Sequence, residues 1–158
     1  HNSLVNWTAQ HRTDSELNIF DLIARITEES SFFSLLGREF NSKYLIFEFK
    51  NYESEINPTT VYTTERYLYK SALRNIAFIV SRKGPSQSTL TAAKGALKES
   101  GKLILFLNDE ELCEMTNSKS KGLDYLDLLY KKLDDFLINI DRKISCQLSS
   151  LCEPCLLF

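Results

Sequence analysis

The stretch that decides the fold is residues 44–50, Tyr-Leu-Ile-Phe-Glu-Phe-Lys, an apolar run that ends in two charged residues. Aromatic and β-branched residues in a run of this length predict a buried β-strand. Glu48 and Lys50 lie two residues apart, so on a strand their side chains project from the same face. The stretch therefore combines a core strand with a charged pair at its end.

Short apolar runs alternate with longer amphipathic runs on both sides of this strand, which is typical of α/β proteins. We expect further strands at residues 17–26, 75–81 and 102–108. Helices are expected at residues 59–73, 88–99 and 123–140, a short helix or loop at 28–42, and a short helix from 109 to 115. These elements predict a mixed sheet of four to five strands flanked by helices, with an added C-terminal helix.

Length and composition indicate one ordered globular domain. The 158 residues are 43% hydrophobic and 25% charged, and the net charge of −2 excludes a histone-like protein bound by bulk positive charge. No run of about 18 apolar residues occurs, so we expect no membrane span. No signal peptide is recognised, and we expect a cytoplasmic protein. We assign residues 1–141 to the domain, with its core at about 14–115, and residues 142–158 to an apolar tail.

The tail contains three of the four cysteines, Cys146, Cys152 and Cys155, the last two in a CxxC arrangement. A zinc site normally needs a second pair of ligands, and both histidines lie near the other end of the chain. We therefore predict no metal site in the tail.

Asp21 interrupts the apolar strand at 17–26 and, if the two strands are neighbours, lies beside Glu48. Buried charges are costly unless they are paired or bind metal. Two carboxylates suit Mg²⁺, with the backbone carbonyl of Phe49 as a further ligand, and Lys50 would orient or help deprotonate an attacking water. This predicts a metal-dependent phosphodiesterase site. The alternative is a structural role, in which Glu48 and Lys50 form an ion pair and Asp21 caps or hydrogen-bonds the backbone. Taken without their wider context, the three residues favour this structural interpretation.

The wider pattern favours the catalytic interpretation. Asp21 and Glu48 are separated by 27 positions on consecutive predicted strands, within Phe20-Asp21-Leu22-Ile23 and Phe47-Glu48-Phe49-Lys50-Asn51-Tyr52. Downstream follow AFIVSRKG at 77–84, an Ala92-Ala93 helix and LILFLNDEEL at 103–112. Over residues 14–115 the chain resembles the PD-(D/E)xK restriction-endonuclease-like superfamily, closest to its Mrr-like, or type IV restriction endonuclease, branch.

The resemblance implies an αβββαβ core and a Mg²⁺-dependent endonuclease, with Mn²⁺ as a substitute, that hydrolyses DNA phosphodiester bonds. Asp21, Glu48 and Lys50 would be catalytic, and Asp21, Glu48 and the Phe49 carbonyl would hold the metal. The domain would be the effector of a prokaryotic defence or restriction system, with DNA, a second copy of the chain and a fused or associated sensor or ATPase component as partners.

Weaker candidates surround this set. Accessory roles are considered for Asp14, Glu16, Glu65 and Tyr67. Residues 66–102 contain eight basic residues and one acid, and the loop with Arg82, Lys83 and Ser86 is the predicted contact for DNA phosphate. An equally weighted alternative is that these basic residues only keep the domain soluble.

Two other function classes stay open. One is a catalytically silent nucleic-acid-binding or scaffold domain with the nuclease fold. The other is an unrelated α/β protein that binds a small molecule at the ends of its strands.

Overall fold

The computed structural model describes residues 4–12, 19–28 and 30–140, and for residues 4–12, 19 and 20 it describes the backbone only. Five strands form one mixed sheet in the order of the sequence: β1 (Leu4–Arg12), β2 (Ile19–Ile26), β3 (Tyr44–Lys50), β4 (Ile76–Ser81) and β5 (Leu103–Asn108). β1, β2 and β3 are antiparallel neighbours, whereas β4 and β5 run parallel to β3. The predicted α/β class with a mixed sheet is confirmed.

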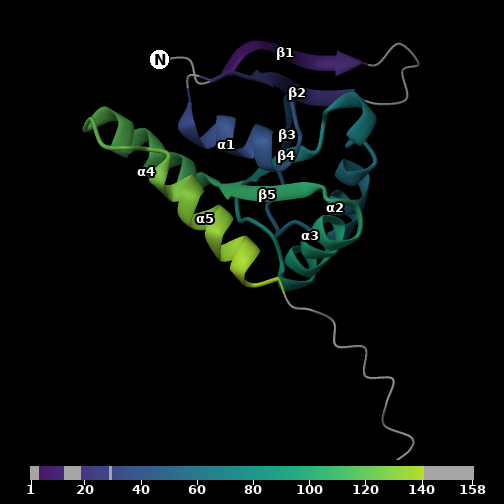
Figure 1. The fold of residues 1–158 in the computed structure, drawn as a ribbon. Helices are drawn as coiled ribbons and strands as arrows, with labels where there is room; N and C mark the ends of the chain where they lie inside the picture. The colour runs from purple at the N-terminus through teal and green to yellow at the C-terminus, as the bar shows by residue number, and fades with distance from the viewer. Residues whose placement is uncertain (1–3, 13–18, 29, 141–158) are drawn as a thin grey trace, which may run out of the picture.

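Helices cover both faces of the sheet (Figure 1). They are α1 (Ser31–Glu39), α2 (Pro58–Glu65), α3 (Gln87–Ser100), α4 (Asp109–Ser120) and α5 (Asp127–Ile138), with a 3₁₀ turn at Lys70–Ala72. α2 and α3 lie on one face, and α1 and α5 lie on the other. Because parallel neighbours need a crossover, α2 connects β3 to β4 and α3 connects β4 to β5.

The core is built around β4, all six residues of which are buried. A strand covered by helices on both faces is apolar throughout, as in IAFIVS. On the α1 face, the rings of Phe47 and Phe78 stack at 5.4 Å, and Phe32 of α1 meets Tyr130 of α5 edge-to-face at 4.9 Å. These contacts fix the sheet between its two helical layers.

The N-terminal strand β1 was not predicted. Its sequence, LVNWTAQHR, mixes polar and apolar residues without a strict alternation, so the pattern gives a weak strand signal. It forms because β2 offers a free edge, along which Leu4 to Arg12 pair with Ile26 to Ile19. The order of elements is therefore ββαβαβαβαα, which differs from the implied αβββαβ core: α1 and α2 separate β2, β3 and β4, so the described residues contain no run of three consecutive strands.

The helix expected over residues 59–73 ends at Glu65. Four threonines and a valine among its eight residues make α2 a weak helix former. Beyond it, Tyr69 and Arg74 form an isolated bridge around the 3₁₀ turn. Tyr69 and Leu73, which lie beyond the end of α2, are exposed, and so is Tyr62 within α2.

The two C-terminal helices also differ from their predicted limits. α4 begins with a reciprocal capping box between Asn108 and Glu111 and extends to Ser120, beyond the predicted end at residue 115. Gly122 then adopts a φ of 71°, and α5 begins only at Asp127, not at residue 123. The predicted tail at 142–158, including its cysteines, lies outside the described residues.

Candidate functional site

The site begins where β2 and β3 stop pairing. Their last paired residues are Leu22 and Phe47, and the same register places Asp21 opposite Glu48. Residues directly opposite each other in an antiparallel pair project from the same face. Asp21 Oδ2 accepts a hydrogen bond of 2.8 Å from the backbone N–H of Phe49. The structure thus brings Asp21, Glu48 and Lys50 together on one face at the end of β3.

Glu48 is the buried member of this group, with only 4% of its surface exposed. Its Oε2 accepts a hydrogen bond of 3.1 Å from Lys50 Nζ, whereas its Oε1 is buried and has no hydrogen-bond partner among the described residues. Burial raises the pKa of Glu48; Lys50 opposes that shift, and Asp21 adds to it. A buried carboxylate oxygen without a donor is costly unless it receives a proton or a cation.

Lys50 is charged in this setting. Burial by itself would lower the pKa of Lys50, but Glu48 and Asp21 outweigh that effect and the pKa is raised. An ammonium with a raised pKa is a poor proton acceptor. The positive charge of Lys50 therefore suits a role in orienting a water or in offsetting negative charge. It does not suit the other predicted role, deprotonation of the water.

A hollow of about 280 Å³ lies over Glu48 and Lys50 on the α2 side of the sheet. One wall is a pair of adjacent threonines repeated one helical turn later in α2: Thr59, Thr60, Thr63 and Thr64. Positions four apart lie on one face of a helix, so Thr59 and Thr63 form one row and the buried Thr60 and Thr64 the next; the Thr63 hydroxyl donates to the Thr59 carbonyl. Tyr67 also lines it, as do Tyr52 and Asn57, which the sequence analysis did not single out. The Thr-Thr repeat was the signal that could have identified this wall.

A second hollow, of about 200 Å³, lies at the carboxyl ends of the three parallel strands. Lys50 pairs with Ser81, and Ser81 pairs with Asn108. The residues that follow these three in the sequence therefore lie side by side and line the hollow: Asn51, Arg82 and Asp109. Phe49 and Lys50 also line this hollow. Lys50 therefore borders both hollows, and Arg82 lies close to the charged group.

Glu65, Lys83 and Ser86 line neither hollow. Glu65 Oε1 accepts hydrogen bonds from Ser100 at 2.9 Å and from Lys102 at 3.5 Å, beside the start of β5 and away from both hollows. The Ser86 hydroxyl caps α3 by accepting from Thr89 N. Lys83 is exposed in the same loop. Asp14 and Glu16 lie outside the described residues.

The basic residues of the middle segment do not share one face. Arg82 and Lys83 follow the carboxyl end of β4, whereas Arg74 and Lys102 precede the amino ends of β4 and β5. A strand of six residues spans about 20 Å, so the two groups lie at opposite ends of the sheet. Arg82 and Lys83 are the part of this charge that lies near the candidate site.

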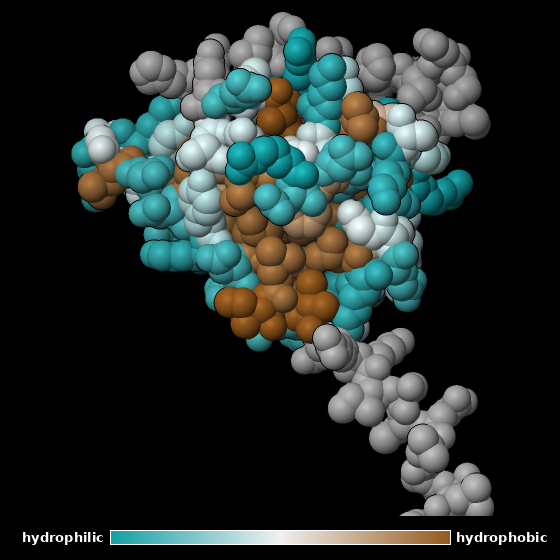
Figure 2. Space-filling model, in the orientation of Figure 1, coloured by the Kyte–Doolittle hydropathy of each residue, from teal (hydrophilic) through white to brown (hydrophobic). Residues whose placement is uncertain are grey.

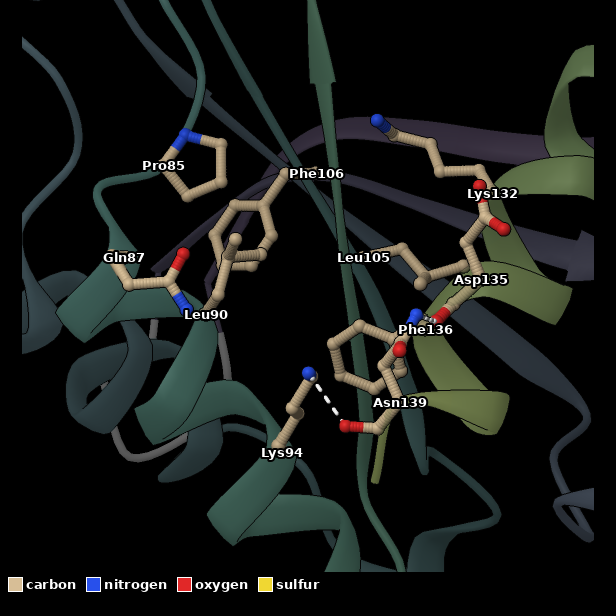
Figure 3. A pocket seen from close by; sticks show the side chains of 10 residues that line it. All are labelled: Pro85, Gln87, Leu90, Lys94, Leu105, Phe106, Lys132, Asp135, Phe136 and Asn139. Atoms are coloured by element: carbon tan, nitrogen blue, oxygen red, sulfur yellow. Dashed lines mark hydrogen bonds between the residues drawn. The ribbon is translucent and has the colours of Figure 1, made fainter. Parts of the chain in front are cut away.

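A further hollow, of about 620 Å³ and so larger than the two at the site, lies between α3 and α5 over β5 (Figure 3). Leu105, Phe106 and Phe136 line it, and Lys94 Nζ donates a hydrogen bond of 2.7 Å to the carbonyl of Asn139 across it. Apolar side chains gather over this region of the surface (Figure 2). None of the predicted site residues lines it, so size alone does not identify the site.

The donors around Asp21 fit Mg²⁺. Within the described residues no group of three or more His, Cys, Asp and Glu side chains converges, but Mg²⁺ takes few protein ligands and keeps several waters. The Phe49 N–H points toward Asp21, and in an extended strand the carbonyl of the same residue points the same way. The two carboxylates and this carbonyl therefore provide three oxygen ligands.

None of the described helices is long and apolar enough to cross a membrane. Comparisons with protein-family models, with curated proteins and with solved structures found no match to this chain.

Proposed function

We propose that this chain is a Mg²⁺-dependent endonuclease domain, similar to the Mrr-like restriction endonucleases, that hydrolyses DNA phosphodiester bonds. The observation that carries the proposal is the convergence of Asp21, Glu48 and Lys50 from two strands, with Oε1 of the buried Glu48 without a partner among the described residues. A carboxylate whose pKa is raised by burial, as that of Glu48 is, and which lines a cleft is a candidate for a functional site.

Asp21, Glu48 and the Phe49 carbonyl would hold the metal. Bound Mg²⁺ supplies Lewis-acid polarisation of the phosphate and lowers the pKa of a coordinated water. Lys50 keeps its positive charge and is placed to orient that water and to offset the negative charge that develops on the phosphate. The threonines of α2 form a polar wall along which the substrate backbone would lie.

The structural alternative shares part of the geometry. An Asp21 that bonds the Phe49 backbone and a Glu48–Lys50 ion pair would both be found in a purely structural cluster. Such a cluster does not explain a third element, the buried Oε1 of Glu48, which has no hydrogen-bond partner within the part of the chain that the structure describes. Replacing a buried ion pair by apolar residues is often neutral or stabilising, so stability alone does not account for the three charges.

The resemblance extends the proposal to the biological setting. The domain would be the effector of a prokaryotic defence system in the cytoplasm, acting on DNA together with a sensor or ATPase component. Cleavage of both strands by one site per chain would require a second copy.

Plasmid nicking tests the proposed reaction. The wild-type chain is expected to relax supercoiled plasmid in Mg²⁺ and not in EDTA, and Lys50→Ala is expected to lower the rate by about 10²–10³-fold. Lys132→Ala is the matched control, because Lys132 also pairs with a glutamate, Glu111, and has the same 27% side-chain exposure as Lys50.

Equal nicking by Lys50→Ala and the wild type would show that the proposed role of Lys50 is wrong. Retained DNA binding without any Mg²⁺-dependent nicking by the wild type would favour the silent nucleic-acid-binding domain instead.

A further inference from the structure

Phe49 is unusually exposed for its strand. Leu45 and Ile46 of β3 are fully buried, whereas 52% of the surface of Phe49 is exposed. In the sequence Phe49 lies between the two charged residues Glu48 and Lys50. Its backbone is held by the hydrogen bond to Asp21, and because side chains alternate along a strand, the ring projects from the face opposite to that of Glu48 and Lys50, into the hollow at the strand ends that Lys50 also borders. An exposed aromatic ring fixed beside a candidate catalytic lysine is a surface for stacking.

The hollow that Phe49 lines has the chemistry of a nucleobase site. Besides the ring it presents the amide of Asn51, the guanidinium of Arg82 and the carboxylate of Asp109, the residues that follow three parallel strands. Carboxyl ends of parallel strands are a common place for ligands in open sheets. Amide, guanidinium and carboxylate groups match the donors and acceptors of base edges, and a ring matches a base face.

The hollow has mixed charge, because the cations Lys50 and Arg82 line it together with the carboxylate of Asp109. Like charges repel, so a phosphate would lie beside the two cations and away from Asp109. On the other side of Lys50, Tyr52 is 47% exposed and lines the hollow along α2. Two exposed rings therefore flank the lysine, one in each hollow.

We propose that the hollow lined by Phe49 and Arg82 binds an unpaired DNA base next to the cleaved phosphate, so that the preferred substrate is single-stranded DNA. The inference rests on the proposed nuclease function. In a duplex both faces of each base are covered by its neighbours, and a base reaches an aromatic ring only after unstacking. A single strand presents its bases without that cost, and stacking on protein rings tolerates any sequence.

Binding and cleavage of matched DNA substrates test this. The full chain is titrated, in EDTA, into a fluorescein-labelled single-stranded oligonucleotide, the same sequence as a perfect duplex, and a duplex with one unpaired nucleotide, with anisotropy as the readout. We expect tighter binding of the single strand and of the bulged duplex than of the perfect duplex. Cleavage of the three substrates in Mg²⁺ is expected to follow the same order.

Phe49→Leu removes the ring but keeps the backbone carbonyl and an apolar side chain. It is expected to weaken single-strand binding by about 5- to 150-fold, the range measured for loss of one stacked base. Tyr69→Leu is the control, because Tyr69 is 45% exposed but lies before the amino end of β4, at the opposite end of the sheet. Thermal unfolding of both variants checks that the fold is retained.

The outcomes separate the two proposals. Single-strand preference that is lost in Phe49→Leu and kept in Tyr69→Leu supports the base site, even if no substrate is cut and the nuclease function fails. Equal affinity for single strand and perfect duplex, or equal affinities of Phe49→Leu and Tyr69→Leu, overturns the base site while leaving Mg²⁺-dependent cleavage to stand.

Discussion

The backbone N–H of Phe49 donates a hydrogen bond of 2.8 Å to Oδ2 of Asp21, across the point where β2 and β3 cease to pair. One carboxylate oxygen thus satisfies the donor that the missing ladder bond would leave open, and the same carboxylate adds to the rise in the pKa of Glu48. The bond makes Asp21 both a link between the strands and a candidate ligand, and the two roles can be separated by substitution.

Asp21→Asn keeps an oxygen acceptor for Phe49 N–H but removes the charge. We expect its stability to stay close to that of the wild type while Mg²⁺-dependent nicking is lost. Asp21→Ala also leaves the N–H unsatisfied and should lower the free energy of unfolding by about 1 kcal/mol, because the site is partly exposed to water. Urea unfolding and plasmid nicking of both variants check this. Equal stability of the two variants would contradict the linking role of the bond.

Glu48→Gln is expected to raise stability at neutral pH and to abolish nicking. The pKa of Glu48 is raised chiefly by burial, so the folded chain binds this proton more tightly than the unfolded chain does. Its contribution to stability is therefore full below the ordinary glutamate pKa and is lost as pH rises through the folded value. Melting temperatures of wild type and Glu48→Gln across pH in EDTA check this, and their difference should grow as pH rises.

Mg²⁺ is expected to raise the melting temperature of the wild type, because it binds the folded carboxylates and not the unfolded chain. At a concentration a hundred times its Kd, the gain is about 2.7 kcal/mol. Asp21→Asn and Glu48→Gln should lose this response. Glu65→Gln should keep it, because Glu65 contacts Ser100 and Lys102 away from the site. Differential scanning fluorimetry with Mg²⁺ and EDTA measures it; a Mg²⁺ response in Asp21→Asn equal to that of the wild type would argue against a metal at Asp21.

Leu73 is expected to be replaceable by glycine with a gain in stability. Its φ is 52°, in the left-handed region that costs a side-chain-bearing residue about 1–2 kcal/mol. The conformation is held because its carbonyl accepts hydrogen bonds from Lys43 N, Tyr44 N and Ser42 Oγ. Leu73→Gly should be about 1 kcal/mol more stable than Leu73→Ala, which keeps the strain. Urea unfolding of the pair measures the difference, and equal values would mean that the turn carries no strain.

The sequence was sufficient for the inner strands and for half of the site. The apolar run of β3 and the two-residue repeat of strands placed Glu48 and Lys50 on one face, because that geometry is local to one segment. β4, α3 and β5 were also predicted to within one residue, since a buried strand and a capped helix leave strong local patterns. The hydrophobic pattern did not predict β1, because that strand depends on its pairing with β2. The pattern also did not predict the end of α2, which depends on packing against the sheet.

Tertiary structure alone decided which residues meet. Register between β2 and β3 put Asp21 opposite Glu48, and parallel pairing of β3, β4 and β5 brought Asn51, Arg82 and Asp109 to one hollow. The tertiary structure also places Glu65 beside Lys102 and the basic residues at two opposite ends of the sheet. A sequence encodes the face on which each side chain lies along its own element, whereas distances between elements depend on strand order and register, which are set by the packing of the whole core.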